Sequence, residues 1–183
     1  PHVAIFWLAS EDHDFAEINH AYLFGKKVEW SGDSISGGCV GRIPVETLAP
    51  VLDGLFSIMG ERDKANELKK IIGDAYRGSK TLADATFAFV NALFGKYGLV
   101  IIDADNAELK NIFLPVITDE LTKQSSFKCI TATNERLIET GIEPQVHARE
   151  INLFYINGRE RNRIEKQGDK YVIVNTSVTF THE

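Results

Sequence analysis

The sequence predicts an α/β fold in which a doubly wound parallel sheet with helical insertions precedes a small β-rich subdomain. Two short apolar runs, residues 3–9 and 99–105, are each followed by a helical pattern, as expected of strands that pair in a buried parallel sheet. Helical spacing dominates the chain between those runs. Near the C-terminus, Asn157-Gly158 and Gly168-Asp169 separate β-branched and aromatic runs, which indicates an antiparallel meander.

The first apolar run, residues 3–9, predicts a strand that is buried on both faces. Ser10 is a suitable N-cap, and a helix is expected to follow over residues 11–22. Residues 26–30 alternate weakly and predict a second strand. The glycine-rich segment 31–44 predicts a loop, because clusters of glycine and serine rarely continue a helix or strand.

Helices are expected next over residues 45–59, 62–76 and 81–98. Pro50 and Gly54 weaken the first of them. Thr81-Leu-Ala-Asp84 resembles a capping box, and Gly98 is a typical C-terminal residue. A second buried strand, residues 99–105, then leads into a helix over 107–123. Composition shifts near Ser125, so we predict an α/β domain over 1–124 and a β-rich subdomain over 125–183.

Composition excludes several classes of protein. The chain has 183 residues, a net charge of −6 and a pI of about 5.4, so it carries no basic footprint for nucleic acid. No apolar stretch approaches the roughly 18 residues that span a membrane, and the given sequence shows no signal-peptide pattern. Cys39 and Cys129 are far apart and lie in no metal-binding spacing, which predicts two reduced cysteines in a cytoplasmic protein.

A dense polar stretch, "SEDHDFAEINH", directly follows the first strand. On a helix its polar residues His13, Glu17 and His20 would share one face, opposite an apolar face. Asp12 and Asp14 would lie in the first turn, where the helix dipole favours carboxylates. Ligands of open α/β sheets bind beyond the carboxyl ends of strands, so this stretch is the first candidate site.

Three interpretations of this stretch remain open on physical grounds. His13 and His20 are about 10 Å apart along a helix axis, so they cannot easily share one metal ion, and no tightly bound metal is expected. An acid–base or substrate-binding role suits a histidine beside carboxylates. A capped, solvated helix with surface histidines explains the same residues equally well.

Other candidates are weaker. Asp103 ends the second strand, where acids often contact ribose or metal, whereas Asp105 is better explained as a helix cap. The glycine-rich loop fails the dinucleotide-binding pattern, and Cys39 within it has no fixed base partner. Gln145, His147 and Arg149 alternate before an apolar run, so on a strand they would point to one face as a pocket wall or as the solvated face.

Three segments taken together resemble one known family. They are "VAIFWLASEDHDFAEINHAY", "KYGLVIIDADNAELK" and "REINLFYINGRERNRI", in that order along the chain. The family is bacillithiol synthase, the cysteine-adding enzyme of bacillithiol biosynthesis. The first segment is specific and the other two are looser, and the resemblance covers essentially the whole chain. Five positions match the family motif: Asp12, His13, Asp14, Asn19 and His20.

This resemblance implies a Rossmann-like, nucleotidyltransferase-type core with connecting-peptide insertions and, in the full-length protein, a C-terminal coiled coil that forms a homodimer. The chain begins directly before a strand, ends in the strand-like "VTFTHE" and lacks the family's TGQQ-type motif and coiled coil. We therefore expect an internal fragment that is inactive in isolation.

The resemblance also implies the reaction. Family members are thought to join cysteine to glucosaminyl malate, and ATP is the expected co-substrate that activates the cysteine carboxylate. From their placement after the first strand, rather than from the family match, the predicted catalytic residues are Asp12, His13, Asp14 and His20. The predicted substrate- or nucleotide-binding residues are Glu17, Asn19, Asp103, Gln145, His147 and Arg149. Two alternatives remain: a non-catalytic module that binds sugar or nucleotide, and a metal-dependent hydrolase.

Overall fold

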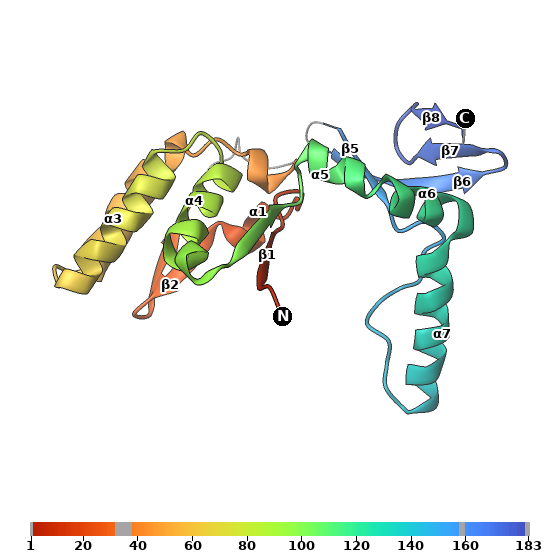
Figure 1. Ribbon diagram of the computed structural model, residues 1–183, viewed down its shortest axis with the longest axis horizontal. Helices are drawn as coiled ribbons and strands as arrows, with labels where there is room; N and C mark the ends of the chain where they lie inside the picture. The colour runs from red at the N-terminus through yellow and green to blue at the C-terminus, as the bar shows by residue number, and fades with distance from the viewer. Residues whose placement is uncertain (1, 32–37, 158–159, 182–183) are drawn as a thin grey trace. The chain divides into compact units, whose positions relative to one another are not determined.

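The computed structural model describes residues 2–31, 38–157 and 160–181. The chain forms two compact units, Pro1–Asn106 and Ala107–Glu183 (Figure 1). The division falls earlier than the change in composition near Ser125, on which the predicted domain boundary rests. Within the described ranges, no helix is long and apolar enough to cross a membrane.

Two parallel strands lie in the first unit. β1 (Ile5–Leu8) pairs with β4 (Val100–Asp103) in the register Ile5↔Val100 to Leu8↔Asp103. Both predicted strands are therefore confirmed, and their carboxyl ends lie at the same edge. In the described residues, this parallel sheet has these two strands only, and the β1 side chains are largely exposed except for Leu8. The prediction that the first strand is buried on both faces was wrong for this unit.

The predicted helix over 11–22 was also wrong. Only α1 (Phe15–Ile18) is helical, and the chain then enters a hairpin of β2 (His20–Leu23) and β3 (Lys26–Glu29). Phe24 and Gly25 form its turn with φ values of 50° and 76°, and such positive values suit a two-residue hairpin turn. The antiparallel ladder thus contains His20, which the predicted helix would have placed on its polar face.

Helices form the rest of the first unit, with α3 and α4 packed together (Figure 1). Their bounds are η1 (Val40–Arg42), η2 (Glu46–Leu48), α2 (Ala49–Met59), α3 (Asp63–Arg77), α4 (Leu82–Phe94) and η3 (Gly95–Tyr97). Pro50 lies in the first turn of α2 rather than in its interior, where the missing N–H removes no helical hydrogen bond. It therefore opens the helix instead of weakening it.

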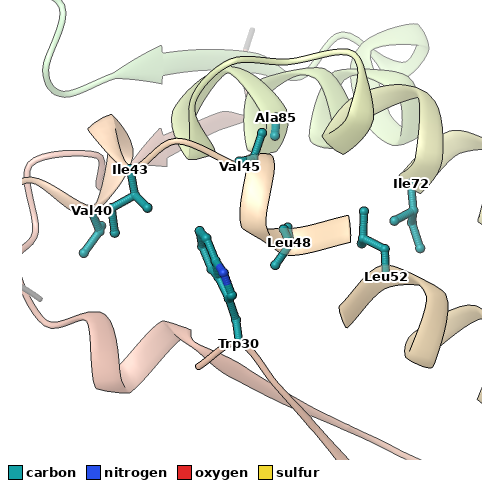
Figure 2. Packing of buried hydrophobic residues seen from close by; sticks show 8 residues of the cluster. All are labelled: Trp30, Val40, Ile43, Val45, Leu48, Leu52, Ile72 and Ala85. Carbon is teal, nitrogen blue, oxygen red and sulfur yellow. The ribbon is translucent and has the colours of Figure 1, made fainter. Parts of the chain in front are cut away.

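A buried cluster around Trp30 holds these elements together. Figure 2 shows the indole lying among side chains from η1, η2 and the segment between them. The cluster consists of Trp30, Val40, Ile43, Val45, Leu48, Leu52, Ile72 and Ala85. The Trp30 Nε1–H donates to Thr47 Oγ1 at 3.0 Å, so the one polar atom of the buried ring is satisfied.

In the residues that the structure describes, the second unit combines three helices with a four-stranded antiparallel sheet. The helices are α5 (Ala107–Ile112), α6 (Leu114–Lys123) and α7 (Ser125–Glu139). The strands are β5 (Phe154–Asn157), β6 (Glu160–Gln167), β7 (Lys170–Ile173) and β8 (Thr179–Phe180), in the order β5-β6-β7-β8. The predicted meander is confirmed, although residues 158–159 of its first turn lie outside the described residues.

Two features of the helices differ from the prediction. The helix over 107–123 is two helices, because Pro115 lies in the first turn of α6 and a new helix begins there. The helix α7 was not anticipated. The segment before the meander, which was expected to be β-rich, therefore begins with fifteen helical residues.

Candidate functional site

A partly buried hydrogen-bond network joins the carboxyl ends of β1 and β4. The Ser10 hydroxyl, on a residue that is 2% exposed, donates to the Asp103 carboxylate. The Asp105 backbone N–H donates to Ser10 Oγ and to Asp103 Oδ1, both at 3.0 Å. Ser10 is therefore not a helix cap: it fixes the edge at which the two strands end.

Arg42 brings a positive charge to this edge from a different element. Its Nε donates to Asp105 Oδ2 at 2.5 Å and its terminal nitrogen donates to Oδ1 at 2.7 Å. The hydrogen bond and charge of Asp105 raise the pKa of Arg42 further above its ordinary value. About half of the Arg42 side chain remains exposed. A fixed guanidinium that faces solvent can receive a phosphate or carboxylate.

Gly41 allows the Arg42 segment to approach the end of β1. Its N–H donates to the Ser10 carbonyl at 2.9 Å, and the Val40 N–H donates to the Asp12 carbonyl at 2.7 Å. A Cβ atom at Gly41 would lie only 2.4 Å from the Ser10 Cβ. Only glycine therefore fits at this point of contact.

The loop after β1 carries the first predicted site residues. Asp12 Oδ1 accepts from the His13 backbone N–H at 2.7 Å and lies 3.3 Å from His13 Nδ1. The backbone hydrogen bond lowers the pKa of Asp12 despite an opposing effect of partial burial. Both side chains are about half exposed. Asp14 accepts from the Glu17 N–H at 3.3 Å and is the N-cap of α1, a role that Ser10 was expected to fill.

The predicted polar stripe of His13, Glu17 and His20 does not exist, because the three residues lie in a loop, a short helix and a strand. His20 is exposed on β2, where its Nδ1 lies 2.9 Å from Asn19 Oδ1 and its ring packs edge-on against Tyr22. The geometry therefore supports His13 at the strand edge more directly than it supports His20.

Gln145, His147 and Arg149 lie in the second unit, in a segment that is not a strand. The prediction that they alternate along one strand face was wrong, since the sheet begins only at β5. Gln145 donates to the Glu143 carbonyl at 3.4 Å, and Arg149 lies over the Phe154 ring. Of these three residues, only Arg149 belongs to the group of arginines around Phe154.

Sequence reasoning missed the Ser10 hydroxyl and Arg42 as parts of the site. Both follow recognisable signals, since Ser10 comes directly after a strand and Arg42 closes the glycine-rich loop. Their pairing with Asp103 and Asp105 spans more than sixty residues of sequence and has no local signature. In the ranges that the structure describes, no three His, Cys, Asp or Glu side chains form a group that could hold a metal ion.

Comparison with known proteins identifies the family. The model for the "Bacillithiol biosynthesis BshC, N-terminal Rossmann-like domain" matches residues 1–183. The chain belongs to the BshC family. This assignment confirms the resemblance and the Rossmann-like α/β class, and it covers both compact units.

BshC relatives occur in distant bacteria, each named "Putative cysteine ligase BshC". The chain is 46% identical to that of Flavobacterium johnsoniae over 181 residues, which is 99% of this chain and 34% of the relative. It is 41% identical to that of Cytophaga hutchinsonii, covering 98% and 32%. The relative from Staphylococcus haemolyticus is 26% identical, covering 99% and 36%. The chain thus spans about a third of the length of these BshC relatives.

Proposed function

We propose that this chain is the N-terminal Rossmann-like part of a longer cytoplasmic, homodimeric cysteine ligase of bacillithiol biosynthesis. The names of the BshC relatives support a ligase that acts on cysteine. The observation that carries the proposal is the polar edge at the carboxyl ends of β1 and β4, where ligands of open α/β sheets bind.

The proposed reaction has two steps. The cysteine carboxylate attacks the α-phosphorus of ATP, which forms a mixed anhydride with AMP and releases pyrophosphate. The amine of glucosaminyl malate, after losing a proton, then attacks the activated carbonyl carbon, so that an amide bond forms and AMP leaves. Both steps develop negative charge on oxygens, which nearby cations stabilise.

The residues of the edge suit separate parts of this reaction. Arg42 and His13 would bind phosphate oxygens, since each presents a donor to solvent. Asp12, whose lowered pKa keeps it ionised, would hold the cysteine ammonium group or the ribose. Asp103 and Ser10 are positioning residues, because their hydrogen bonds are directed inward and hold the two strand ends together.

The proposal is tested by product formation in the complete ligase. His13→Ala should reduce the rate of bacillithiol formation from cysteine, glucosaminyl malate and ATP by about 10²-fold, the size of the loss when a donor to the developing charge is removed. His20→Ala tests whether the hairpin also reaches the substrate. Lys64→Ala, on the exposed first turn of α3, is the matched control. Unchanged product formation by His13→Ala would contradict the role of this edge.

A further inference from the structure

Three arginines gather on the solvent-facing side of the C-terminal meander. Arg161 and Arg163 are two residues apart on β6, so they project from the same face, and Phe154 of β5 is the register partner of Arg163. The guanidinium carbon of Arg161 lies 3.7 Å from the centre of the Phe154 ring, and that of Arg149 lies 5.7 Å from it. Side chains from two separate segments thus bring positive charge to one aromatic ring.

Few ion pairs compensate the positive charge of these three arginines. Within the described ranges, Arg149 and Arg161 form no ion pair, and Arg163 has only Glu165, at 3.5 Å and with both side chains about half exposed. An ion pair of that kind contributes little. Stacking on Phe154 orients the guanidinium groups and offsets part of their mutual repulsion. A bound anion would offset the repulsion that remains between the guanidinium groups. A guanidinium is suited to bind a carboxylate through two parallel hydrogen bonds.

A cavity of about 250 Å³ lies beside these arginines. It is formed where β6 continues past Arg163, the last residue of β6 in register with β5, and where residues 149–151 run alongside. Its lining combines cations, anions and two apolar side chains: Arg149, Glu150, Ile151, Arg163, Ile164, Glu165 and Lys166. Three cations and two carboxylates leave a small positive excess. This balance suits a ligand of modest negative charge and disfavours a polyphosphate.

We propose that this surface, formed by Arg149, Arg161, Arg163 and the adjoining cavity, binds the carboxylates of the ligase's acceptor substrate. The inference rests on the proposed function, because that function supplies an acceptor with two carboxylates on its malate group and an amine on its sugar. The arginines hold the malate carboxylates.

Calorimetry and steady-state kinetics on the complete ligase test this site. Arg161→Ala and Arg163→Ala should each raise the Kd for L-malate and the KM for glucosaminyl malate by about 10-fold or more, which corresponds to the loss of a charge-assisted hydrogen bond. The KM values for ATP and cysteine should stay unchanged, and kcat at saturating acceptor should change little. Arg161→Lys should restore only part of the affinity, since lysine cannot bind a carboxylate through two parallel bonds. Arg136→Ala, on the exposed surface of α7, is the matched control.

The outcomes separate this site from the proposed function. If the arginine variants bind malate and use the acceptor as the unchanged ligase does, the site is overturned while the ligase stands. If malate binding depends on the arginines but no product forms, the carboxylate site stands and the ligase proposal fails. Inorganic phosphate and ATP serve as competitors. If either displaces malate more effectively than glucosaminyl malate does, the surface is a phosphate site and the carboxylate assignment is wrong.

Discussion

Single residues at the strand edge form hydrogen bonds that their neighbours in sequence do not predict. Asp103 was predicted as a site residue because it ends a strand, and the structure places it at that edge. Its partner Ser10 was predicted to cap a helix, but its Oγ instead accepts a hydrogen bond from the Asp105 N–H. A cap is predictable because it needs only nearby residues, whereas this network depends on strand pairing across ninety-three positions.

Gly41 should tolerate no side chain. In Gly41→Ala, the new Cβ would overlap Ser10 and force apart the Arg42 segment and the end of β1. We expect a loss of about 1–3 kcal/mol in the free energy of unfolding, measured by urea denaturation. Gly54→Ala is the control, since open space surrounds that position within α2, and it should stabilise by about 0.5–1 kcal/mol. Equal stability of the two variants would contradict the proposed close contact.

Glu120 stabilises the second unit as a buried anion. Its carboxylate accepts from the Ser126 N–H at 3.0 Å and the Asn152 N–H at 2.8 Å, although the residue is only 6% exposed. Burial alone would raise the pKa of Glu120, but these backbone hydrogen bonds outweigh it and the pKa lies below 4.5. The ionised form therefore favours folding above pH 4.5, and this contribution is lost as the pH falls through the lowered pKa.

Glu120→Gln should accordingly cost about 1–3 kcal/mol at pH 7, because one of the two N–H groups loses its acceptor and the other keeps only an uncharged amide oxygen. The difference from the unchanged protein should shrink in denaturation experiments below pH 4.5. Glu135→Gln, on the exposed surface of α7, should cost little at either pH. A deficit of Glu120→Gln that stays constant with pH would show that the carboxylate does not act through its charge.

Secondary-structure elements were predictable where local signals act alone. The capping box of α4 was read from four residues, and Thr81 Oγ1 accepts from the Asp84 N–H at 3.2 Å as expected. The helix over 11–22 failed because the turn at Phe24 and Gly25 pairs β2 with β3, and strand pairing there overrides helical periodicity. A periodic pattern of only twelve residues could not distinguish these outcomes.

Thr81→Ala should remove the cap of α4 and cost about 1 kcal/mol of unfolding free energy, measured by chemical denaturation. Ser57→Ala, at an exposed position inside α2, is the control. That variant should be neutral or slightly stabilising, because alanine is a better helix former. If both variants were equally stable, the side-chain cap would contribute nothing.

At the scale of the whole molecule, sequence patterns predicted the class but not the extent of the sheet. Two parallel strands and the meander were correct, while α7 and the β2–β3 hairpin were missed. The apolar side chains of β1 other than Leu8 are exposed, with Ile5 at 57% and Trp7 at 54%. Their apolar run predicted burial in a parallel sheet with helices on both faces, and that prediction was wrong, since the described residues supply only two strands of such a sheet.

The central claim is that the edge formed by β1 and β4 activates the cysteine carboxylate. Cysteine-dependent exchange of labelled pyrophosphate into ATP, catalysed by the complete ligase, measures that step without the acceptor. Arg42→Ala should lower the exchange rate by about 10²-fold, as expected when a donor to the developing charge is lost, whereas Arg77→Ala on α3 should not. Exchange by Arg42→Ala at the rate of the unchanged protein would contradict the account.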